Sequence, residues 1–151
     1  MHNLLYKASQ DGWFDEIFHE KCDNKGATLT IAKSEGFIFG GFTRASWGGM
    51  NITYKGFVYD EKAFLFSLTD GHGRLPSKLE LIHAKFAIQN DFKAGPNFGA
   101  GNDLRLHLKE QIVKCCPHSY KVPTGYRADH FLCGATSARL DEVEVYYIPD
   151  E

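Results

Sequence analysis

The chain has 151 residues, the usual size of one domain, so we expect a single domain over residues 1–151. Twelve phenylalanines and seven tyrosines against two methionines favour half-buried sheets over a helical bundle. The net charge of −2, without long runs of like charge, argues against binding to nucleic acid or to an anionic membrane surface.

The N-terminal sequence lacks a basic segment followed by an apolar one, which a secretory signal would need. No apolar run approaches the roughly 20 residues of a membrane span. We therefore expect a cytoplasmic protein without direct membrane insertion.

The first predicted element is an amphipathic helix whose apolar residues share one face: Trp13, Phe14, Ile17, Phe18 and Cys22. The segment from Asp23 to Gly26 ends it, because glycine accepts the left-handed backbone of a helix C-terminus. A strand follows over residues 28–31, where the alternation predicts that Leu29 and Ile31 face the core and the threonines face outward.

A tight turn at residues 34–36 leads into a second strand over residues 37–43, which together predict a hairpin. The paired glycines Gly40 and Gly41 indicate a bulge or a close approach of the backbone. Residues 44–60 are expected to form a long surface excursion with at most a short edge strand around residues 51–54.

The apolar run at residues 63–69 predicts a strand in the middle of the fold, buried on both faces. Residues 74–80 are expected to form a polar connection. Further strand segments are predicted at residues 81–83, 85–88, 103–108, 131–133 and 142–147. Many short strands with one clear helix predict a mainly β fold, a two-sheet antiparallel β-sandwich flanked by a few short helices.

Six segments, taken in order, closely resemble the TLDc domain family. They are the opening run from Leu4 to Thr43, Ala63–Thr69, Gly95–Leu104, His118–Tyr120, Phe131–Gly134 and Glu142–Tyr146. The resemblance covers nearly the whole chain and implies the same two-sheet sandwich. It also implies protection against oxidative stress and association with the peripheral, ATP-hydrolysing sector of the vacuolar proton pump (the V-ATPase). Many relatives join this domain to other modules, so the chain is expected either to act alone or to be an excised piece.

The glycine-rich segment at residues 95–101 invites comparison with a phosphate-binding loop. A P-loop needs Gly-Lys-Ser/Thr opening a helix, whereas here Asn102 and the carboxylate of Asp103 precede a strand pattern. We expect a turn that folds back onto the sheets, or a loop that binds a partner through an exposed Phe98. The interaction-loop candidates are Trp47, Gly95, Phe98, Gly99, Gly101 and Asp103.

The four cysteines, Cys22, Cys115, Cys116 and Cys133, are expected to be reduced thiols, because their spacing resembles no secreted disulfide framework. Cys22, Cys115 and Cys116 are the redox candidates, with Cys22 close to His19 at helical spacing and Cys115 next to Cys116. A zinc site from Cys115, Cys116, His118, His130 and Cys133 is disfavoured by their spacing, so no metal or cofactor is predicted.

No catalytic motif of a common enzyme class occurs, and no pair of acidic residues stands out. We therefore expect a non-catalytic interaction domain whose partner is a protein. The alternative hypothesis is a thiol-dependent, peroxide-consuming activity of the cysteines. A third is a small-ligand site that uses Trp13 or Trp47 as a stacking platform.

Overall fold

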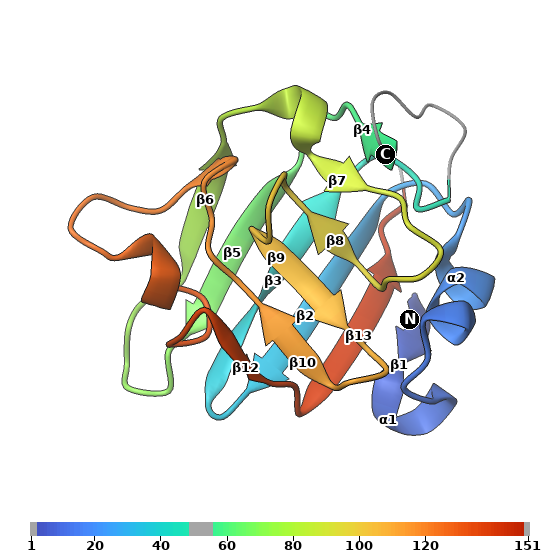
Figure 1. The fold of residues 1–151 in the computed structure, drawn as a ribbon, viewed down its shortest axis with the longest axis horizontal. Helices are drawn as coiled ribbons and strands as arrows, with labels where there is room; N and C mark the ends of the chain where they lie inside the picture. The colour runs from blue at the N-terminus through green and yellow to red at the C-terminus, as the bar shows by residue number, and fades with distance from the viewer. Residues whose placement is uncertain (1–2, 49–55, 150–151) are drawn as a thin grey trace.

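The computed structural model describes residues 3–48 and 56–149, and it shows two antiparallel sheets packed face to face (Figure 1). The helices α1 (Ala8–Asp11) and α2 (Asp15–Cys22) lie at one side of this sandwich. The 3-10 turns η2 (Ala84–Phe86) and η3 (Ala128–His130) lie in the connections. The predicted mainly β, two-sheet sandwich with short flanking helices is confirmed.

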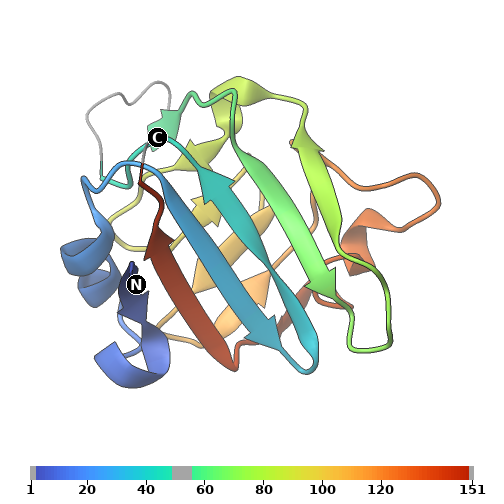
Figure 2. The same ribbon diagram turned by 180° about the vertical axis from the view of Figure 1, so that it is seen from behind.

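One sheet has seven strands within the described residues, and its spatial order brings the first and last strands of the chain together. In that order the strands are β1 (Leu4–Lys7), β13 (Glu142–Tyr147), β2 (Thr28–Ser34), β3 (Phe37–Thr43), β5 (Phe64–Thr69), β6 (Ser77–Leu81) and β11 (Tyr120–Lys121). Seen from behind, this sheet has no helix or strand in front of it (Figure 2).

The other sheet has six short strands among the described residues. They are β12 (Ser137–Arg139), β10 (Ile112–Lys114), β9 (Leu104–His107), β8 (Asn97–Phe98), β7 (Ile88–Gln89) and β4 (Phe57–Val58). The two inner faces enclose a core of apolar side chains that includes Ala32, Phe39, Leu65, Phe98, Leu104, Leu106 and Val145. Facing layers of this kind are what each half-buried sheet requires.

The predicted hairpin is present as β2 and β3, paired from Thr28 with Thr43 to Ser34 with Phe37. Its turn residues Glu35 and Gly36 both have positive φ, at 48° and 91°. Two such residues form the turn that matches the right-handed twist of the flanking strands.

The two faces of β2 are the reverse of the prediction. Thr28 and Thr30 are buried, whereas Leu29 and Ile31 are half-buried on the outside of the sheet. The alternation was therefore right and its phase was wrong. The Thr28 hydroxyl accepts a hydrogen bond from the Trp47 indole N–H, at 3.0 Å, which offsets the cost of burying that side chain.

The paired glycines of β3 mark close approaches, as predicted. A Cβ on Gly40 would lie 1.8 Å from the Thr30 carbonyl oxygen. A Cβ on Gly41 would lie 2.6 Å from the ring of Phe98 in the facing sheet. Glycine at these positions lets a neighbouring strand and an aromatic ring come within contact distance.

Several predicted boundaries were wrong. The expected connection at residues 74–80 contains most of β6, and the expected strand at residues 85–88 is divided between η2 and β7. Residues 131–133 form a turn after η3 and not a strand. The possible edge strand around residues 51–54 lies outside the described residues. The strand β5 lies in the interior of its sheet, between β3 and β6, as predicted, but it is not buried on both faces, since Leu68 is 42% exposed.

Candidate interaction site

The residues proposed for a docking loop are mostly inside the protein. Trp47, Phe98 and Asp103 are each 0% exposed, so none of them can serve as an exposed anchor. The Trp47 ring packs edge-on against Phe98, at 5.4 Å between ring centroids, and against Phe18 of α2 at 5.8 Å. The expectation of an exposed Phe98, or of Trp47 as a stacking platform, was wrong because these rings join the helix to both sheets.

The Asp103 carboxylate is the centre of the glycine-rich segment. Its Oδ2 accepts hydrogen bonds from the backbone N–H groups of His118, Ser119 and Tyr120, at 2.7, 2.7 and 3.1 Å. Burial raises the pKa of Asp103 and outweighs these bonds, which act to lower it. A Cβ on Gly99 would meet this carboxylate at 2.2 Å. The glycine-rich segment is therefore connected inside the protein to the loop at residues 118–120.

The other two candidate glycines have structural roles as well. A Cβ on Gly95 would lie 2.9 Å from the carbonyl oxygen of Leu106, so the backbone here runs directly over β9. Gly101 is exposed with a φ of 106°, a conformation that favours glycine, and its missing Cβ faces the His118 imidazole.

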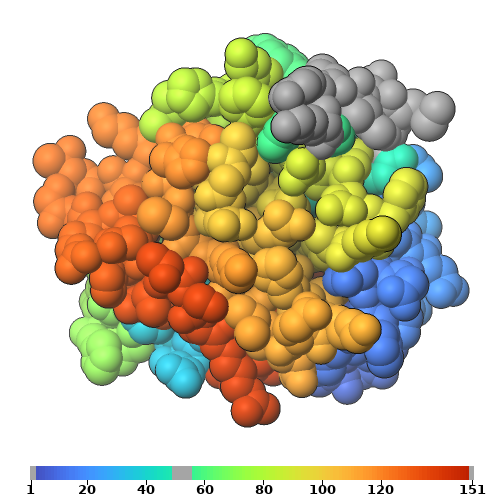
Figure 3. All heavy atoms as spheres, in the orientation of Figure 1, coloured from blue at the N-terminus to red at the C-terminus, as the bar shows by residue number. Residues whose placement is uncertain are grey.

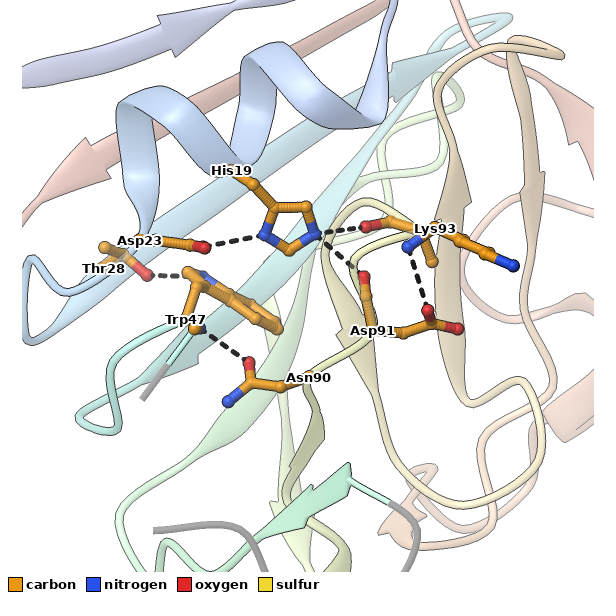
Figure 4. A network of polar contacts seen from close by, with 9 residues as sticks. His19, Asp23, Thr28, Trp47, Asn90, Asp91 and Lys93 are labelled. Atoms are coloured by element: carbon orange, nitrogen blue, oxygen red, sulfur yellow. Dashed lines mark hydrogen bonds and ion pairs between the residues drawn. The ribbon is translucent and has the colours of Figure 1, made fainter. Parts of the chain in front are cut away.

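A second network holds a different loop against helix α2 (Figure 4). The Nδ1 atom of His19 lies 2.8 Å from the carboxylate of Asp23, and its Nε2 atom lies 2.9 and 2.8 Å from the carbonyl oxygens of Asp91 and Ala94. In the same network, the Gly48 N–H donates a hydrogen bond to the side-chain oxygen of Asn90 at 3.0 Å.

The partners of His19 define its charge. All three are hydrogen-bond acceptors, and only an imidazolium carries an N–H on both ring nitrogens. Burial acts to lower the pKa of His19, but the hydrogen bond and charge of Asp23 and the two carbonyl groups outweigh it, so the pKa is raised above 6.5. These contacts favour the protonated ring, which clamps the loop against α2.

The clamped loop, residues 90–94, carries an exposed aromatic ring. Phe92 is 76% exposed, and its ring centroid lies 5.6 Å from that of His19. The loop backbone is held further by a hydrogen bond from the Lys93 N–H to Asp91 and by an ion pair between Asp91 and Arg105 at 3.7 Å. In Figures 1 and 3 the yellow segment of this loop lies against the blue helix at the surface.

Sequence reasoning missed this loop. The signal was present in the apolar Phe92 between Asp91 and Lys93, in a segment that ends in a glycine and a proline. The distant partner His19 had been considered only as a base for Cys22, whereas its ring contacts Asp23 and the loop. A contact between residues more than seventy positions apart leaves no local pattern.

The cysteines do not behave as predicted. Cys115 and Cys133 form a disulfide, so the expectation of four reduced thiols was wrong, and Cys115 does not pair with its neighbour Cys116. Cys116 is half-buried and free. Cys22 is fully buried, and burial raises the pKa of its thiol to about 12, which keeps it protonated and unreactive.

Within residues 3–48 and 56–149, no group of three or more His, Cys, Asp and Glu side chains is arranged to hold a metal ion. In the same residues, no helix has the length and apolar character that crossing a bilayer requires.

The fold and the site together define an antiparallel β-sandwich domain in which buried polar side chains hold loops in place through hydrogen bonds. Residues 2–149 match the TLDc domain family. The chain belongs to this family, and the match spans nearly its whole length, as the resemblance of its motifs implied. No curated protein matches the chain.

Proposed function

We propose that this TLDc domain is a non-catalytic interaction domain of the cytoplasm, which contributes to protection against oxidative stress by associating with the peripheral, ATP-hydrolysing sector of the vacuolar proton pump. The resemblance to TLDc proteins suggests this partner and this setting, and membership of the family supports the suggestion. Recruitment to an organelle membrane then depends on that partner.

The observation that carries the proposal is a rigid loop with an exposed aromatic side chain. Phe92 is 76% exposed, while the backbone on both sides of it is bonded to His19. An aromatic ring presented on a fixed backbone loses little conformational entropy on binding, and such rings dominate the energy of protein interfaces. The loop thus suits the role of an anchor in a partner's pocket.

The test compares Phe92→Ala with Leu75→Ala, whose side chain is 78% exposed on a different loop and serves as the matched control. Each protein is used to capture pump subunits from lysate, and the subunits are quantified individually. We expect Phe92→Ala to reduce their recovery roughly tenfold or more, the size of an interface hot spot, and Leu75→Ala to leave it unchanged. Absence of pump subunits from the wild-type fraction would refute the proposal.

A second candidate function is thiol-dependent consumption of peroxide, and the Cys115–Cys133 disulfide favours it. In the reduced protein one thiolate would attack the peroxide O–O bond, giving a sulfenic acid and one water molecule. The other thiol would displace that oxygen as a second water and form the disulfide, which an external dithiol must reduce for turnover.

Peroxide loss measured in the presence of a dithiol distinguishes the two functions. If the thiols act, Cys115→Ser and Cys133→Ser should fall to the background rate, whereas the control Cys22→Ser, with its buried thiol, should keep the wild-type rate. Cys116→Ser shows whether the half-buried neighbour takes part. An equal rate in all four variants discards this candidate.

A further inference from the structure

The outer surface of the seven-stranded sheet carries two rows of side chains that run across its strands. The register places Leu4, Tyr146, Leu29, Phe42 and Phe64 next to one another in the first row. The second row runs through Glu144, Ile31, Gly40, Phe66 and Lys78. We call these ten residues the outer rows.

The two glycines of β3 show which side of the sheet these rows occupy. The missing Cβ of Gly41 faces Phe98 of the other sheet, so Gly41 lies on the inner side. The missing Cβ of Gly40 faces the ring of Phe66, at 2.8 Å, on the opposite side. Because side chains alternate along a strand, the outer rows share the face of Gly40.

Apart from Glu144 and Lys78, the outer rows are apolar, where an exposed sheet face is normally polar. The rings of Phe42 and Phe64 stack at 5.2 Å between centroids, and Leu4 is 38% exposed. A groove of about 400 Å³ opens over β1, β13 and β2, lined in part by Leu4, Leu29 and Ile31. In Figure 2 no helix or strand of the described chain lies over the face. An exposed apolar surface of this kind indicates a binding surface.

The charges at the ends of the second row indicate what it binds. Glu144 stands at one end, on β13, and Lys78 stands at the other, on β6, with Gly40 in the middle. Glu144, whose side chain is 17% exposed, lies 3.7 Å from Lys7, and Lys78, whose side chain is 55% exposed, lies 3.7 Å from Glu80 and 4.5 Å from the centre of the Phe64 ring. Ion pairs at the protein surface contribute about 0–1 kcal/mol, so a facing charge of opposite sign can add to these contacts.

We propose that the outer rows bind a second copy of this chain, forming a symmetric dimer in which the two seven-stranded sheets pack face to face. A two-fold axis parallel to β3 and close to Gly40 would place Glu144 of each copy opposite Lys78 of the other. The same axis would bring Ile31 opposite Phe66, twice. Such a self-complementary patch is what a two-fold interface requires. Each copy has one apolar layer between its own two sheets, and the dimer would add a third layer between the copies.

The dimer is tested first by sedimentation equilibrium of the whole chain over micromolar to millimolar concentrations. We expect a concentration-dependent dimer that Ile31→Lys weakens by about a hundredfold or more, because the change places charges at the centre of an apolar interface. The control Glu20→Lys alters a charge of similar size on the exposed side of α2 and should leave the dimer unchanged. Circular dichroism of each variant confirms that it is folded.

The charge pattern gives a sharper test. Glu144→Lys and Lys78→Glu should each weaken the dimer roughly tenfold, since each places like charges opposite one another at two equivalent positions. The double variant Glu144→Lys/Lys78→Glu should recover the wild-type affinity. An equimolar mixture of the two single variants should also associate, because only the mixed dimer pairs opposite charges at both ends.

A chain that stays monomeric at all concentrations would overturn the proposal and leave the face to a different protein. A dimer that Ile31→Lys leaves intact, or single variants that the mixture does not rescue, would overturn it as well. These outcomes are separate from pump association, since Phe92 lies outside the outer rows and its replacement should leave the dimer unchanged.

Discussion

Thr28 and Thr30 both point inward from β2, but only one of their two hydroxyl groups is hydrogen-bonded. The Thr28 hydroxyl accepts the indole N–H of Trp47, whereas the Thr30 hydroxyl, on a fully buried side chain, has no hydrogen-bond partner among the described residues. An unmatched buried polar group costs about 1–3 kcal/mol. The two residues therefore make a matched pair for measuring what a buried hydroxyl contributes.

We expect Thr30→Val to raise the free energy of unfolding by about 0.5–1.5 kcal/mol, because it replaces an unpaired hydroxyl by a methyl group of similar size. Thr28→Val should lower it by about 1–2 kcal/mol, since it leaves the Trp47 N–H buried and unpaired. Urea unfolding of both variants measures these changes. Equal effects of the two substitutions would contradict the hydrogen-bond assignments.

His19 makes the stability of the protein depend on pH. Its pKa is raised in the folded protein above the value of 6.5, so folding favours the protonated ring. The stabilisation is complete below pH 6.5 and is lost as the pH rises through the higher folded pKa. On deprotonation one ring nitrogen becomes an acceptor, so His19 loses either its hydrogen bond to Asp23 or its hydrogen bonds to the loop at residues 90–94.

We expect His19→Gln to lower the free energy of unfolding by roughly 1–2 kcal/mol at pH 6, with a smaller difference from the wild type at pH 9. Urea unfolding across this range measures the difference, and His72→Gln, an exposed histidine, is the control. A difference that does not change with pH would show that His19 acts as a neutral ring.

Gly41 of β3 sets how closely the two sheets pack, because the ring of Phe98 on β8 fills the space where its Cβ would lie. A methyl group there must displace the ring or push the layers apart, and well-packed cores resist both.

Gly41→Ala should lower the free energy of unfolding by roughly 2–4 kcal/mol. Adding Phe98→Leu should restore part of that loss, because the smaller side chain vacates the space that the methyl group needs. A double-mutant cycle measures the coupling. Strict additivity of the two changes would mean that the ring and the glycine do not touch.

Local signals in the sequence predicted the elements well where turn residues mark them. Glu35 and Gly36 define the β2–β3 hairpin, and the spacing of Phe18 and Cys22 defines α2. The same signals could not give the phase of β2, because alternation says that two faces differ and not which one meets the other sheet. The phase of β2 depended on Trp47, nearly twenty residues away, which bonds to the inward-facing Thr28.

The site was harder to predict because it depends on contacts between distant segments. Asp103 and Phe98 were singled out as interaction-loop candidates, but both are buried, because strands that pair only in the folded chain cover them. The Cys115–Cys133 disulfide and the contacts of His19 with the carbonyl groups of residues 91 and 94 likewise form only in the tertiary structure. Sequence thus identified residues of structural weight and misjudged whether they faced solvent.

Across the whole domain, the pairing of β1 with β13 brings the two ends of the described chain together. The Tyr147 N–H donates to the Asn3 carbonyl oxygen at 2.8 Å. On the other side of the molecule, residues 124–127 form an exposed loop away from this pair. A domain with adjacent ends and an exposed loop tolerates a change in where the chain starts.

A circular permutant joined by a flexible linker of roughly six residues, with new ends between Thr124 and Gly125, should therefore fold. We expect a loss in the free energy of unfolding on the order of 1–3 kcal/mol. A second permutant opened between Gly40 and Gly41, inside β3, should not fold. Circular dichroism and chemical unfolding compare the two; folding of both would mean that β3 does not organise the sheet.

The same strand pair decides how the domain responds to tension. Because β1 and β13 are antiparallel and Leu4 lies opposite Tyr146, both ends leave the sheet from the same side. Pulling on them loads the inter-strand hydrogen bonds one at a time, as in opening a zipper, and not all together in shear. The domain should yield at low force, beginning with β1, before the disulfide between Cys115 and Cys133 bears any load.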